Sequence, residues 1–64
     1  MSYCRFENTS RDLMDCVEAI NDGKTENLNS YETDGLETLL RLCKEIVDQE
    51  EHIEEVIEES REDN

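Results

Sequence analysis

The sequence predicts an all-α protein in which a short helix and a long helix form a helical hairpin that assembles as a coiled-coil-like homo-oligomer. The chain contains no proline, and its apolar residues recur at helical spacing in two separate stretches. Apolar residues make up 34% of the 64 residues and charged residues 39%, so little core can form within one copy. Because a lone domain of this size is marginally stable, one small helical domain over residues 1–64, supported by self-association, is expected.

The N-terminal residues 1–9 are expected to form an extended segment that packs against the helices. The aromatic side chains of Tyr3 and Phe6 favour this, since burying each is worth about 1.5–3 kcal/mol. The first helix is predicted at residues 10–22, with Thr9 as its N-cap. Its apolar residues fall on one helical face: Leu13, Cys16, Val17 and Ile20.

A polar connection joins the two predicted helices. Gly23 is expected to follow the first helix in the left-handed conformation that glycine adopts most easily. Asn29 or Ser30 is expected to cap the second helix, because short polar side chains accept a hydrogen bond from the first turn. The length of this connection is usual for two antiparallel helices.

The second helix is predicted at residues 30–60, and residues 61–64 are expected to be a frayed acidic tail. Gly35, early in this helix, indicates either a close helix crossing or a kink. The apolar residues follow the spacing of a heptad repeat, which is typical of helices that pack on other helices. They are Leu36, Leu39, Cys43, Ile46, Ile53 and Ile57.

The unequal lengths of the two helices predict an interface. The first helix can cover only the first half of the second, about residues 36–47. Apolar residues beyond this point form the predicted oligomer seam, because an exposed apolar row marks an association surface. The seam consists of Ile46, Ile53, Val56 and Ile57. Repulsion between acidic ends favours antiparallel helices in the oligomer, with those ends near Arg41 and Lys44.

The net charge of the chain restricts the classes of molecule that it is expected to bind. Nineteen acidic and six basic residues give a net charge of −13. This charge argues against direct binding to nucleic acid or to anionic membranes, and favours a basic protein partner or mimicry of nucleic acid. No transmembrane or signal segment is expected, and three cysteines indicate a reduced, cytoplasmic compartment. The plainest alternative is that the acidic face only contacts water.

No catalytic or metal motif is recognisable. The cysteines Cys4, Cys16 and Cys43 together with His52 have the composition of a zinc site, yet they lack the close paired spacing of such sites. Cysteines on apolar faces behave as small hydrophobic residues, and a lone histidine among glutamates is expected to be solvated. Neither a metal nor another cofactor is predicted, and the chain is not expected to be an enzyme.

Two candidate binding surfaces remain. The first is an acidic face for a protein partner, made of Glu51, Glu54, Glu55 and Glu58. The second is an N-terminal group for a small anionic ligand such as a nucleotide, since helix N-termini and arginines attract anions. It consists of Tyr3, Arg5, Phe6 and Arg11. Alternatively, the two aromatic side chains fill the core and the arginines pair with acids of the chain itself.

The opening MSYCRFENT at residues 1–9, together with Asp12-Leu13, Asp15-Cys16, Leu42-Cys43 and Glu45-Ile46, resembles a group of very small proteins encoded by tailed bacteriophages. The resemblance covers roughly residues 1–47, and the extension to Asn64 is longer and more acidic than is typical of the group. It implies a phage origin and a place in the host cell cytosol. Small phage proteins of this kind are often accessory factors, including inhibitors of host defence.

These observations lead to three hypotheses about function. The first is an acidic accessory protein that binds and inhibits a host protein involved in defence or in handling nucleic acid. The second is an oligomeric sponge that sequesters a nucleotide-like anion at the N-terminal group. The third is a structural or scaffolding oligomer without a ligand.

Overall fold

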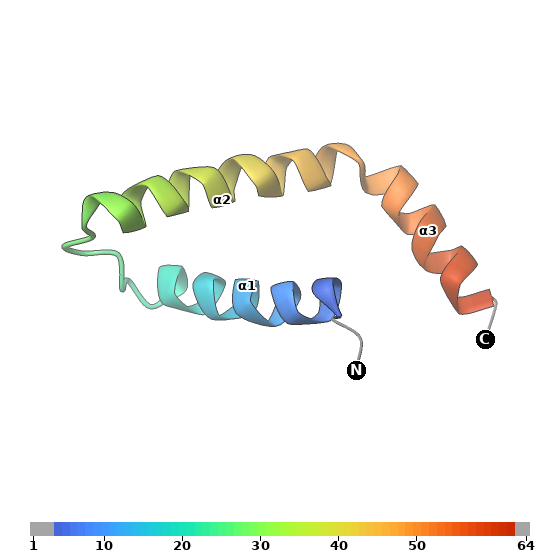
Figure 1. The fold of residues 1–64 in the computed structure, drawn as a ribbon, viewed down its shortest axis with the longest axis horizontal. Helices are drawn as coiled ribbons and strands as arrows, with labels where there is room; N and C mark the ends of the chain where they lie inside the picture. Colours follow the sequence, from blue (N-terminus) through green and yellow to red (C-terminus); the bar gives the residue numbers. More distant parts are fainter. Residues whose placement is uncertain (1–3, 63–64) are drawn as a thin grey trace.

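A computed structural model describes residues 4–62, which form three helices and no strand, so the predicted all-α class is confirmed for this range. Helix α1 spans Arg5–Asn21, α2 spans Ser30–Asp48 and α3 spans Glu50–Glu62. Helices α1 and α2 run in opposite directions and are joined by the loop at residues 22–29. Helix α3 leaves the far end of α2 at an angle and lies beyond the N-terminal end of α1 (Figure 1).

Helix α1 begins five residues earlier than predicted. Its first backbone hydrogen bond runs from the amide of Asn8 to the carbonyl of Cys4, at 2.9 Å. The extended segment predicted over residues 1–9 is therefore wrong for residues 5–9, and residues 1–3 lie outside the described range. The physical reason is that residues 5–9 contain neither glycine nor proline, and Glu7 favours a helix N-terminus through its negative charge.

This early start changes the surroundings of two residues. Thr9, the predicted N-cap, lies inside α1 instead of before it. The side chain of Phe6 is 84% exposed and does not fill the core. An exposed aromatic ring is unfavourable in water, so this end of α1 leaves apolar surface without cover in the single copy.

The end of α1 follows the sequence prediction. Gly23 has a φ of +74°, and its amide donates to the carbonyl of Ile20 at 3.1 Å. The amide of Lys24 donates to the carbonyl of Ala19 at 2.9 Å, which completes a Schellman motif. The predicted left-handed glycine after the first helix is confirmed, because this motif needs a residue that tolerates positive φ.

The start of α2 is also confirmed. Asn29 occupies the N-cap position with an extended backbone, and its Oδ1 accepts a hydrogen bond from the amide of Glu32 at 2.8 Å. This bond satisfies one of the amides that a helix start leaves without an intrahelical partner.

We predict that Asn29→Ala lowers the free energy of unfolding by about 1 kcal/mol, because the amide of Glu32 loses its acceptor. Urea denaturation followed by circular dichroism at fixed protein concentration measures the change. Asn29→Asp is the matched control, since aspartate caps helices equally well. Equal stability of the alanine variant and the parent would contradict this role of the cap.

The long second helix predicted at residues 30–60 is instead two helices that meet at Gln49. The amide of Gln49 donates to the carbonyl of Ile46 at 3.0 Å, three residues back instead of four. Its side-chain Nε2 donates to the carbonyl of Glu45 at 3.3 Å and so replaces the missing backbone donor. A side chain that enters the hydrogen-bond ladder is a known cause of helix kinks. At the C-terminal end, residues 61 and 62 of the predicted frayed tail belong to α3.

In a single copy, residues 4–62 form no buried core. None of the described residues is buried, and the best-covered apolar side chains are only half-buried. They are Leu13, Cys16, Ala19, Leu28, Leu36, Leu39, Cys43 and Ile53. Within residues 4–62, no two residues twelve or more positions apart bring their Cα atoms within 8 Å. The expected close packing of the first helix on residues 36–47 is therefore absent from the single copy.

The solvent-accessible surface of the chain is larger than that of a compact protein of the same mass. The chain exposes 6323 Å². A compact folded monomer of 7.5 kDa exposes about 4,200 Å² by the usual scaling of surface with mass. The difference, about 2,000 Å², is surface that a compact protein of this size normally covers.

Candidate functional site

Helix α3 carries two opposite surfaces. Its apolar stripe, defined as Ile53, Val56 and Ile57, has the spacing of one helical face. Ile53 is half-buried, whereas Val56 and Ile57 are 47% and 44% exposed. A stripe of this kind is stable in water only when another surface covers it.

The predicted partner-binding residues form the other surface of α3, which we call the acidic face. All four side chains are exposed, and their spacing places them on the side of α3 away from the apolar stripe. They are Glu51, Glu54, Glu55 and Glu58. Covering the apolar stripe therefore leaves the acidic face accessible.

The charges of α3 are not balanced within the helix. It contains seven glutamates and one basic residue, Arg61, in its last turn. Like charges four residues apart destabilise a helix by about 0.2–0.5 kcal/mol per pair. Within residues 4–62, the one ion pair joins Arg11 Nη2 to Glu7 Oε2 at 3.5 Å, and it lies on α1. The acidic face thus has no basic partner in the described part of its own chain.

The predicted anion-binding group is not brought together by α1. Arg5 is the first residue of this helix, and Arg11, six positions later, lies on a different side of it. Arg11 pairs with Glu7, as the alternative of arginines answering the chain's own acids expects. Tyr3 lies outside the described residues. An anion or nucleotide site at these residues stays a prediction.

The predicted oligomer seam is divided between two helices. Ile46 belongs to α2 and is 54% exposed, whereas the other three seam residues form the apolar stripe of α3. The kink at Gln49 lies between Ile46 and Ile53, so the heptad spacing does not run along one straight helix. Self-association through these residues stays a prediction, and α3 carries most of the seam.

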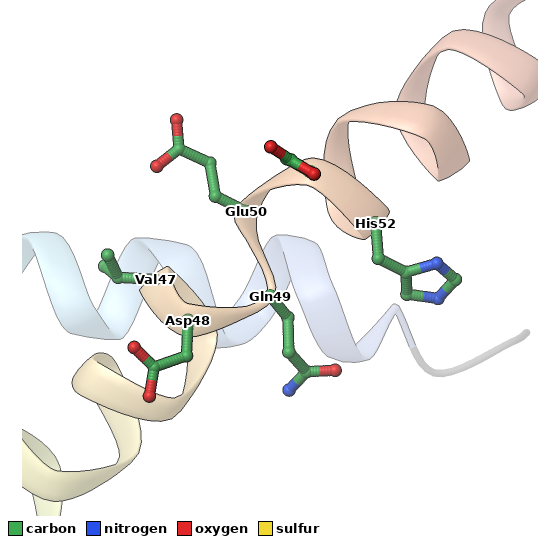
Figure 2. A pocket seen from close by; sticks show the side chains of 6 residues that line it. Val47, Asp48, Gln49, Glu50 and His52 are labelled. Atoms are coloured by element: carbon green, nitrogen blue, oxygen red, sulfur yellow. The ribbon is translucent and has the colours of Figure 1, made fainter.

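The bend between α2 and α3 forms an open hollow lined by consecutive residues from Val47 to His52. Figure 2 shows that its side chains spread apart: Glu50 points to the opposite side of the bend from Asp48, and His52 points away from both. A general acid–base pair needs two groups within hydrogen-bond reach of one proton. The hollow therefore offers charge but no convergent catalytic group.

A groove that the sequence reasoning missed lies between α1 and α2, at the end near the loop. Its volume is about 330 Å³, and most of its lining is apolar. The apolar side chains are Cys16, Ala19, Ile20, Leu28, Leu36 and Leu39. Gly35 also lines it, and the small size of residues Ala19 and Gly35 was the available sequence signal.

Other residue types do not gather into a site in the described part of the chain. No three side chains among its histidines, cysteines, aspartates and glutamates are placed to hold a metal ion. Cys16 and Cys43 are half-buried on the inner sides of α1 and α2. None of the described helices has the length and apolar character needed to cross a bilayer.

No protein-family model, curated protein or solved structure matches the chain. The class of protein is therefore defined by the fold and the surfaces alone. It is a small all-α protein whose third helix separates an apolar stripe from an acidic face.

Proposed function

We propose that the chain is a small acidic accessory protein of phage origin, which self-associates and acts by binding and inhibiting a host protein with a basic surface. In this proposal the acidic face of α3 contacts the target, which belongs to host defence or to the handling of nucleic acid. The protein works in the host cell cytosol and acts by occupying a surface instead of by catalysis.

The concentration of charge on α3 is the observation that carries this proposal. Seven of the chain's nineteen acidic residues lie in this one short helix, although their mutual repulsion destabilises it. Solubility alone needs only a net charge, which the rest of the chain already supplies. Negative charge concentrated on one helix has an effect beyond solubility, since it steers the basic surface of a partner into contact and sets specificity.

Self-association is the second part of the proposal. About 2,000 Å² of surplus surface per copy supports it, because leaving apolar side chains such as Val56 and Ile57 in water is unfavourable. When copies associate through the apolar stripe, the acidic faces point outward. Several identical faces on one particle then strengthen binding to a target that has more than one basic site.

Salt dependence tests how the target is held. The tagged protein is immobilised and exposed to a bacterial host lysate at about 0.05 M salt, where charges interact over ~14 Å. We expect a stoichiometric basic protein to be retained and then released at 1 M salt, where the screening length falls to about 3 Å. Retention of the same protein at 1 M salt would show that apolar contacts, and not the acidic face, hold it.

A further inference from the structure

We infer that the groove between α1 and α2 of one copy receives the apolar stripe of α3 from a second copy, reciprocally, in a two-fold symmetric dimer. This inference rests on the self-association proposed above and identifies the two surfaces that meet. Closed two-fold dimers are the commonest protein assemblies, and reciprocal exchange leaves no binding surface unfilled.

The groove between α1 and α2 has the features of a helix-binding site. Two antiparallel helices with apolar inner sides accept a third helix over the groove between them, as in helical bundles. Gly35 lies on the lining, and no heavy atom comes within 4 Å of the position that a Cβ would occupy there. A neighbouring helix can therefore approach the backbone of α2 closely at this point.

The α3 of the same chain cannot fill this groove. Gln49 alone joins α3 to α2. In Figure 1, α3 follows the end of α2 that lies opposite the loop at residues 22–29, and this loop contributes Lys24, Thr25 and Leu28 to the groove. To reach the groove, α3 would have to turn back along α2, and connections between antiparallel helices normally take 2–8 residues. The α1–α2 connection in this chain uses residues 22–29 for such a reversal.

Pairing of α3 with α3 is the competing way for two copies to meet, and charge disfavours it. It would place two sets of seven glutamates along one short contact, with Arg61 as the basic residue of each helix. Five of the chain's six basic residues precede Gln49, and one of them, Lys24, lines the groove. Glu32 also lines the groove, so Lys24 does not make the groove basic. The electrostatic advantage over α3–α3 pairing therefore comes mainly from keeping the two acidic α3 helices apart.

The uncovered area is sufficient for this dimer. A stable protein–protein interface covers about 800 Å² on each partner, and obligate dimers cover more. The surplus of about 2,000 Å² per copy exceeds the smaller figure. Each copy contributes twice to the contact, once through its groove and once through its α3.

Disulfide trapping between two different full-length copies tests the inference. The first copy carries Cys4→Ser and Cys43→Ala, so that its remaining thiol is Cys16 in the groove. The second copy carries the same two changes with Cys16→Ala, and gains a thiol on the apolar stripe through Val56→Cys or, in a separate variant, Ile57→Cys. The copies are mixed, oxidised with diamide and separated by mass, with a tag on the first copy.

We expect a covalent heterodimer as the main product from at least one of the two stripe variants. The matched control moves the new thiol to the acidic face, as Glu51→Cys, and should give at least tenfold less heterodimer. Trapping of the second copy mainly with itself would overturn the inference in favour of α3–α3 pairing. Heterodimer no more abundant than in the control would overturn it as well, and native mass would show separately whether self-association survives.

A second variant tests the groove with a change that should not unfold α2. Gly35→Leu fills the groove while replacing a poor helix former with a good one, so α2 itself should become more stable. We expect its dimer to dissociate at concentrations at least tenfold higher than the parent dimer. Thr38→Leu, an exposed position on another side of α2, should leave the dissociation constant unchanged. Equal dissociation constants for Gly35→Leu and the parent would overturn the inference.

Discussion

Ile53→Asp should convert the assembled protein into monomers. Ile53 lies between Val56 and Ile57 on the helical face that forms the apolar stripe, and removing such a side chain from an interface forfeits about 1.5–3 kcal/mol per copy. A symmetric dimer loses this contribution twice, so its dissociation constant should rise about 10²–10⁴-fold. Sedimentation equilibrium at micromolar concentration should then report the 7.5 kDa mass of one chain.

Two controls separate this effect from a general loss of helix. Ile53→Leu keeps an apolar side chain of similar volume and should retain the oligomeric mass. Glu55→Gln changes the acidic face of the same helix and should also retain it. If Ile53→Asp keeps the mass of the parent assembly, the apolar stripe is not the interface.

Reversing the acidic face should abolish capture of the host target. Each change of glutamate to lysine adds two positive charges, so the fourfold variant moves the net charge from −13 to −5. The changed residues are Glu51, Glu54, Glu55 and Glu58. Like charges then face one another at the contact, and the penalty of several kcal/mol corresponds to a loss of at least about 100-fold in affinity. Isothermal titration with the purified target measures it.

The matched control applies the same change of net charge elsewhere. Reversal of four exposed acidic residues on α1 and α2 also gives a net charge of −5, but leaves α3 intact. These residues are Asp12, Asp15, Glu18 and Glu37. We expect the control to bind within about tenfold of the parent, because distant exposed charges are largely screened. Equal losses in both variants would show that net charge, and not the acidic face, governs binding.

The sequence predicted the helical class of the chain more accurately than the residues at which each helix begins and ends. The residues that bound the loop could be predicted because their roles depend only on neighbouring residues. Gly23 follows α1 with positive φ, and Asn29 caps α2, as expected. The start of α1 was misplaced because Thr9 has the chemistry of a cap, yet no local feature stops the helix from extending back to Arg5. Capping propensity identifies suitable residues, but it does not say which of them the chain uses.

The kink at Gln49 was not predictable from periodicity. The apolar spacing continues through the bend, and no glycine or proline marks it. At the bend, the side chain of Gln49 donates a hydrogen bond to the carbonyl of Glu45, although glutamine is otherwise a good helix former. The bend directs α3, with both of its surfaces, away from the groove of its own chain.

The candidate surfaces were predicted unequally well. The four glutamates of the acidic face lie together because they fall within one uninterrupted helix, where spacing alone fixes the face. The N-terminal group was assembled on the expectation of an extended segment, and helical geometry separates Arg5 from Arg11. The groove depends on how two helices sit relative to each other, which no single helical pattern contains.

Sedimentation equilibrium of the unmodified protein, combined with circular dichroism over the same concentration range, tests the central claim that one copy cannot cover its own apolar surface. We predict a mass that is a multiple of 7.5 kDa at micromolar concentration, and a helix content that falls as dilution releases single copies. A mass of 7.5 kDa at all concentrations, with undiminished helix content and cooperative unfolding, would contradict the claim.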